Sequence, residues 1–159
     1  MKLEFDIRMK AGDLYDFMLY HTYTGFSGIL GTVAGVLLIV YFSMTLQWIY
    51  LFAGLLIVLY LPCSLYLRSK RQVLTNEFFR EEIHYVFTEE GITVSQGEQS
   101  DTLPWDQVVK AVASPHSIFL YTSRVNAWIF PKKILGEQRV DLIQMISEHV
   151  APAKVKIKQ

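Results

Sequence analysis

The sequence has little that would support catalysis, metal binding or a disulfide. Its single cysteine, Cys63, cannot form an intramolecular disulfide, and its place inside an apolar run indicates a structural side chain. The four histidines show no metal-ligand spacing, and there is neither a Gly-rich phosphate loop nor a Gly-x-Ser-x-Gly elbow. We therefore predict that the chain is not an enzyme and uses no cofactor or metal ion.

Charge is balanced overall but absent from a long central segment. Fifteen basic and fifteen acidic residues give a formal net charge of zero, which argues against a nucleic-acid partner. No charged residue or histidine occurs over residues 26–67, a stretch about twice the ~20 apolar residues that cross a bilayer once. The polar stretch 43–47 divides it, so we predict two transmembrane helices, about Phe26–Phe42 and about Trp48–Leu67, with the lipid bilayer as their environment.

Basic residues flank this segment on both sides. Lys2, Arg8 and Lys10 precede the first span, the turn between the spans carries no charge, and three basic residues follow the second span: Arg68, Lys70 and Arg71. The positive-inside rule then places both termini in the cytoplasm. Each basic side chain near an anionic leaflet contributes about 1 kcal/mol, so the second flank is a candidate anionic-lipid site.

A glycine stripe marks one face of the first predicted span. Gly28, Gly31 and Gly35 lie on this face, and small residues let two helices approach closely in lipid. We expect the stripe to pack against the second helix of the same hairpin; a homodimer contact is the alternative that the pattern leaves open.

The remaining segments predict a mixed α and β domain outside the membrane. Apolar residues alternate with charged ones over residues 3–9, which predicts a strand, and Asp13 is expected to cap a following helix. That short strand must join a sheet formed after the spans. Short strands with frequent turns follow over residues 82–130, which is typical of an antiparallel sandwich or barrel. A helix over about Gly136–Val150 is expected to bury Val140, Ile143, Ile146 and Val150.

The predicted organisation therefore has five parts. They are a strand and helix over residues 1–25, a transmembrane hairpin over 26–67, a helical stalk over 68–81, a cytoplasmic β domain closed by a helix over 82–151, and a basic tail or edge strand over 152–159. The fold class is a membrane α-helical hairpin plus an α+β domain, in which the element count is that of a PH-like barrel.

Four motifs in the last part resemble a known family. They are Tyr85-x-Phe87-Thr88-x-x-Gly91-Ile92, Leu103-Pro104-Trp105-Asp106-x-Val108, Phe119-Leu120-Tyr121 and Ile129-Phe130-Pro131-Lys132-Lys133. In their order and spacing they resemble the YcxB-like family of small bacterial membrane proteins. The resemblance implies a hairpin in the bacterial inner membrane with a cytoplasmic PH-like domain, and it carries over no catalytic residue.

Two strands of this domain are apolar on both faces. If Ile118, Leu120, Ala127 and Ile129 fill the core, then four aromatic side chains point outward: Phe119, Tyr121, Trp128 and Phe130. A large exposed apolar patch marks an interface. The helix at about Leu14–Tyr20 is our first choice for its cover, with the bilayer interface or another protein as alternatives. Arg124, Lys132 and Lys133 are either a patch for anionic lipid headgroups or a solvated loop.

These features together favour a non-enzymatic, membrane-anchored interaction or regulatory module. Its expected partners are the bilayer and a membrane or cytoplasmic protein. The alternative is an accessory subunit of a membrane transport or export complex, contacted through the glycine stripe.

Overall fold

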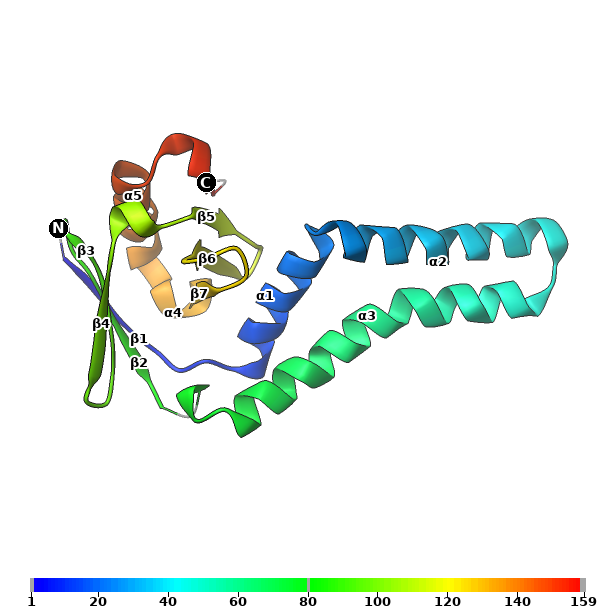
Figure 1. The fold of residues 1–159 in the computed structure, drawn as a ribbon, viewed down its shortest axis with the longest axis horizontal. Coiled ribbons are helices and arrows are strands. Elements are labelled where there is room, and N and C mark those ends of the chain that lie inside the picture. Colours follow the sequence, from blue (N-terminus) through cyan, green and yellow to red (C-terminus); the bar gives the residue numbers. More distant parts are fainter. Residues whose placement is uncertain (1, 80, 158–159) are drawn as a thin grey trace.

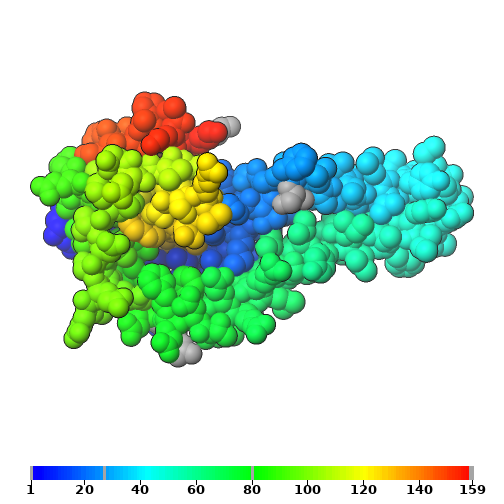
Figure 2. Space-filling view, in the orientation of Figure 1, coloured from blue at the N-terminus to red at the C-terminus, as the bar shows by residue number. Residues whose placement is uncertain are grey.

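The computed structural model describes residues 2–79 and 81–157. Figure 1 shows two parts: a long helical hairpin, and a β-rich domain gathered at the end of the hairpin that is opposite its turn. The space-filling view in Figure 2 shows the same elongated outline, with the first helix of the chain lying between the two parts.

The hairpin consists of α2 (Phe26–Thr45) and α3 (Trp48–Thr75). Leu46 ends α2 in the left-handed region, with φ of 54°, and Gln47 precedes α3. Both helices are long and apolar enough to cross a membrane, and only 11% of each apolar window is buried within the protein. A soluble core helix would be buried on every side. The two predicted spans are thus present, and they suggest a membrane location.

Helix α3 is longer than a bilayer requires. Its 28 residues extend about 42 Å at ~1.5 Å per residue, whereas a hydrocarbon core is about 30 Å thick. Residues 68–75 therefore continue the helix past the apolar segment, and the short 3-10 helix η1 (Glu77–Phe79) follows.

The domain is built from two four-stranded sheets. Sheet A has the order β1-β2-β3-β4, and sheet B has the order β7-β6-β5-β8. The strands of sheet A are β1 (Leu3–Ile7), β2 (Ile83–Phe87), β3 (Gly91–Gln96) and β4 (Gln99–Pro104). Those of sheet B are β5 (Lys110–Ala113), β6 (Ser117–Tyr121), β7 (Ala127–Pro131) and β8 (Val155–Lys156).

The first strand joins a sheet made after the hairpin, as predicted. Strand β1 pairs antiparallel with β2, and Phe5 lies opposite Tyr85. The inward positions of β1 are buried and the outward ones exposed, which is the pattern that the alternating sequence predicts. The basic tail contributes β8, a short edge strand that runs parallel to β5.

The C-terminal helical segment is divided. Helix α4 (Lys132–Leu135) and the 3-10 helix η3 (Gly136–Gln138) precede α5 (Arg139–His149), and Gly136 lies at φ of 52° where the chain changes direction. The predicted core face was partly wrong, because Val140 is 64% exposed. The side chains that α5 and its cap bury are Leu142, Met145, Ile146 and Val150.

Helix α1 (Ala11–Tyr23) begins earlier than predicted. Lys10 is its N-cap, and the Asp13 carboxylate accepts a hydrogen bond from the Lys10 N–H at 3.0 Å. The prediction that Asp13 is the N-cap was therefore wrong. Asp13 lies in the first turn of α1, where the free backbone N–H groups stabilise a negatively charged side chain.

Two apolar cores result from this arrangement. The first lies between the sheets and α5 and includes Phe87, Leu120 and Phe130. The second lies on the other face of sheet B, where α1 covers it, and includes Phe119 and Tyr121. The predicted fold class, a helical hairpin with a PH-like two-sheet domain closed by a C-terminal helix, is confirmed.

Candidate functional site

Helix α1 covers the outer face of sheet B with aromatic contacts. The Phe17 ring lies 5.4 Å from that of Phe119 and 5.9 Å from that of Tyr121, between ring centres. The Tyr20 ring lies 5.4 Å from Phe119. Phe119 and Tyr121 are both fully buried as a result. The chain's own helix, the first of the expected covers, is what occupies this face.

The predicted set of outward-facing aromatic side chains was wrong for strand β7. In the register of β6 and β7, Ile118 lies opposite Phe130 and Leu120 lies opposite Trp128, so these four side chains share one face. Phe130 is fully buried in the first core, which Trp128 also contacts, while Ile129 joins the second core. An error of one residue in the phase of a strand exchanges its faces. Phe119, Tyr121, Trp128 and Phe130 therefore do not form one exposed partner surface.

Polar contacts flank the aromatic contact on α1. The Ser114 hydroxyl donates a hydrogen bond to the Asp16 carboxylate, and the Tyr121 hydroxyl lies 3.5 Å from Nδ1 of His21. The Lys110 ammonium lies 4.1 Å from the centre of the Tyr121 ring, and the electron-rich face of the ring attracts the positive charge. The contacts through Asp16 and His21 join α1 to the sheet and orient it, whereas the Lys110 contact lies within sheet B.

The opposite side of α1 packs along α3. The Tyr15 and Tyr66 rings meet edge to face at 5.5 Å, and Ser69 is fully buried, with its hydroxyl donating to the Tyr66 carbonyl. Val73 of α3 and Phe79 of η1 pack against the second core. Helix α1 is thus held between the extended end of α3 and sheet B, as Figure 1 shows, and it fixes the domain to the hairpin.

The burial of Tyr121 predicts a pH dependence. Burial, with a smaller effect from Tyr20, raises the pKa of Tyr121 to about 12, above the ~10 of an exposed phenol. The folded state favours the neutral phenol. The stability that the folded state gains from keeping Tyr121 neutral is therefore complete below about pH 10, and it is lost as the pH rises from about 10 to 12.

The phenolate absorbance of the full chain and of Tyr121→Phe, titrated in parallel, measures this effect. We expect the difference between the two curves to titrate near pH 12. A difference that titrates near pH 10 would mean that α1 does not shield this hydroxyl.

The predicted basic residues fall in separate places. Arg68, Lys70 and Arg71 are exposed on α3, in the turns that directly follow the apolar segment. Arg124 precedes β7, whereas Lys132 and Lys133 follow it, and five strand residues span about 17 Å. These three residues lie at opposite ends of the strand and do not form the predicted single patch.

The glycine stripe faces neighbours within the chain. A Cβ atom on Gly35 would lie 2.7 Å from Cγ2 of Val58 and 3.0 Å from the Gly54 carbonyl oxygen, so this glycine lets α2 approach α3. A Cβ on Gly31 would meet Leu61 at an ordinary 3.5 Å. Gly28 instead faces the end of α1, where a Cβ would overlap the Thr22 carbonyl group.

Trp105 and His149 serve the packing between sheet A and α5. The indole N–H of Trp105 donates to the Thr88 carbonyl at 2.8 Å, and its ring stacks on His149 with centres 4.9 Å apart. Nε2 of His149 lies 3.0 Å from a Glu89 carboxylate oxygen. Over residues 2–79 and 81–157, no three His, Cys, Asp or Glu side chains come together as a metal site would require.

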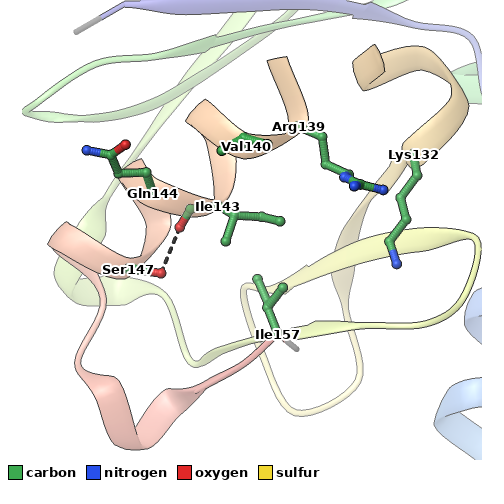
Figure 3. A pocket seen from close by; sticks show the side chains of 7 residues that line it. All are labelled: Lys132, Arg139, Val140, Ile143, Gln144, Ser147 and Ile157. Atoms are coloured by element: carbon green, nitrogen blue, oxygen red, sulfur yellow. Dashed lines mark hydrogen bonds between the residues drawn. The ribbon is translucent and has the colours of Figure 1, made fainter. Parts of the chain in front are cut away.

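A cavity of about 700 Å³ lies beside α5 (Figure 3). Its described lining comes from the start of α4, from α5 and from the C-terminal segment, and comprises Lys132, Arg139, Val140, Ile143, Gln144, Ser147 and Ile157. In Figure 3 the Arg139 guanidinium extends toward the side of Lys132, and Ile143 and Ile157 point into the space between α5 and the C-terminal segment. The sequence did not predict this cavity, because Val140 and Ile143 were both assigned to the buried core.

A comparison with known protein families finds a match for one part of the chain. The family model described as YcxB-like protein matches residues 87–146, so the resemblance carried by the four motifs is confirmed over this range. No curated protein and no solved structure matches the chain significantly.

Proposed function

Residues 87–146 are a YcxB-like domain on a chain with two candidate membrane helices, and from this we propose that the chain is a membrane-anchored interaction module that acts by binding rather than by catalysis. The hairpin is its anchor in the bacterial inner membrane. The domain is the part that a cytoplasmic or membrane partner meets.

The packing of α1 carries this proposal. A domain attached by a flexible linker would sample many orientations, whereas this one contacts the hairpin through α1 and the extended end of α3. Every surface of the domain therefore has a fixed distance from the bilayer. Such an arrangement suits a module that presents one binding surface at a defined height above the lipid.

The basic flank supports a cytoplasmic orientation. Arg68, Lys70 and Arg71 are exposed on α3 at the level where the apolar segment ends. An anionic inner leaflet attracts each of them by about 1 kcal/mol. The shared sheet of β1 and β2 requires the segments before and after the hairpin to lie on the same side of the membrane, and the basic flank favours the cytoplasm as that side.

The alternative of a transport accessory subunit has less support. It depended on a free glycine stripe, but Gly35 packs against Gly54 and Val58 within the hairpin, and Gly28 packs against the end of α1. We therefore retain the binding module as the proposed function.

A topology experiment tests the anchor. A fluorescent protein that matures only in the cytoplasm should be fluorescent on either terminus, and alkaline phosphatase inserted after Leu46 should be active in the periplasm. Opposite locations of the two termini would contradict the proposal.

Photo-crosslinking in living cells tests the binding role. A photoreactive amino acid is placed at Val109, Val125 or Ile134, three exposed aliphatic positions in different parts of the domain. We expect a discrete protein adduct from one position and not from the others. Absence of an adduct from all three, in cells where the chain is inserted normally, would count against a protein-binding module.

A further inference from the structure

We propose that the cavity beside α5 binds a small anionic amphiphile, meaning a molecule with one carboxylate or phosphate head and a short aliphatic tail. This inference rests on the proposed function, since it gives the binding domain a ligand of its own. It concerns the seven cavity residues already described and none of the residues that hold α1.

The apolar half of the cavity fits an aliphatic tail. Val140, Ile143 and Ile157 contribute branched side chains from two separate segments, and Val140 leaves most of its surface exposed. Val140 lies apart from Leu142, Met145 and Ile146, the side chains that α5 buries, and together with Ile143 it gives the cavity an apolar wall. A tail laid between Ile143 and Ile157 would cover it.

The polar half fits an anionic head. Lys132 and Arg139 are basic, and no acidic residue is among the described residues that line the cavity. The Lys132 ammonium donates one hydrogen bond to the Ser114 carbonyl, which fixes its position and leaves two N–H groups for a ligand. The Arg139 guanidinium offers paired donors that match a carboxylate or phosphate.

Two acidic side chains of α5 directly follow lining residues, Asp141 after Val140 and Glu148 after Ser147, and neither lines the cavity. Glu148 accepts a hydrogen bond from the Gln144 side-chain amide at 2.9 Å, which holds the carboxylate on the next turn of α5. Ser147 donates to the Ile143 carbonyl within the same helix. Neither Lys132 nor Arg139 has an acidic partner among the described residues that line the cavity.

The wall formed by the C-terminal segment is held in place. Strand β8 pairs with β5, and the Lys154 ammonium donates to the Val108 carbonyl at 3.2 Å. Ile157 follows directly and lines the cavity. Since small-molecule sites are typically ~300–1,000 Å³ and largely pre-formed, a held wall and a volume of about 700 Å³ suit a short-chain ligand.

Two simpler ligands fit less well. A small anion without a tail would leave the apolar side chains Val140 and Ile143 uncovered, and a neutral lipid would leave the two cations without a negatively charged partner. The combination of head and tail satisfies both halves at once.

Methyl NMR of the full chain in nanodiscs tests the inference. The δ1 methyl groups of isoleucine are labelled, and hexyl phosphate, hexanoate and hexanol are titrated separately. We expect saturable shifts at Ile143 and Ile157 with the two anions, and affinity for hexanol about tenfold weaker. Comparison of hexyl phosphate with hexanoate distinguishes a phosphate head from a carboxylate head.

Two variants distinguish binding in the cavity from nonspecific partitioning of the amphiphile into the bilayer. Arg139→Gln should weaken binding of the anions about tenfold, in keeping with the loss of a charge-assisted hydrogen bond. Lys133→Gln, a neighbouring exposed lysine outside this lining, should leave it unchanged. Equal affinity for hexanol, equal effects of the two variants, or shifts confined to bilayer-facing methyls such as Ile49 would overturn the inference. None of these outcomes depends on the topology or crosslinking that test the proposed function.

Discussion

Replacing Gly35 with leucine is expected to force α2 and α3 apart. A single Cβ at this position would already lie 2.7 Å from Val58 and 3.0 Å from the backbone oxygen of Gly54, and leucine adds three further carbons. Overpacking of this kind costs about 1–3 kcal/mol. In lipid no hydrophobic penalty opposes separation of the helices, so close packing is the interaction that is lost.

The measurement is pulsed EPR between one spin label on each helix, together with the detergent-induced unfolding midpoint. We expect a longer and broader distance distribution and a lower midpoint. Ala34→Leu is the matched control, because Ala34 is the preceding residue of α2 and is exposed. If both variants behave like the original chain, Gly35 does not set the distance between the helices.

The hairpin and the long-range strand were predictable because each depends on a single strong signal. The absence of charge over residues 26–67 predicts two helices long and apolar enough to cross a membrane, and this prediction needs no knowledge of the neighbouring elements. The alternation in β1 similarly predicts its own faces. Its pairing with β2 followed from the requirement that a five-residue strand join a larger sheet.

The failures occurred where both faces of an element are apolar. Strands β6 and β7 are buried on one side by the first core and on the other by α1, so their sequences do not show which residues face which core. The register alone reveals that Phe130 pairs with Ile118. Alternation cannot supply a register that depends on the length of the β6–β7 turn.

The same limit explains why the cavity was not predicted. The sequence of α5 permits two apolar stripes, one through Val140 and Ile143 and one through Leu142 and Met145, which share Ile146. Only the position of sheet B and the C-terminal segment decides which stripe is buried. The stripe that is left over, with Arg139 and Lys132 beside it, became the lining of the cavity.

Helix α1 couples the two parts of the molecule through a core that is separate from the main one. The first core would hold the two sheets and α5 together even without α1. The second core contains residues from α1, α3, η1 and sheet B, so it is the contact through which the hairpin and the domain restrain each other. Loss of this core should therefore uncouple the parts before it unfolds either one.

Phe119→Ala tests that separation. Phe119 is fully buried and contacts both Phe17 and Tyr20, so its truncation should lower the free energy of unfolding of the domain by about 3–5 kcal/mol. Hydrogen exchange of the full chain in nanodiscs should show faster exchange in α1, while α2 and the apolar part of α3 keep their protection.

Phe130→Ala is the matched comparison, since Phe130 is equally buried but belongs to the first core. This variant should lose a similar free energy and should expose amides of β2 and α5 rather than releasing α1 first. Val125→Ala, at an exposed position on the adjacent hairpin, should change stability by less than about 0.5 kcal/mol. If Phe119→Ala and Phe130→Ala give the same exchange pattern, the two cores unfold as one unit, and α1 is a part of the domain rather than the element that couples it to the membrane.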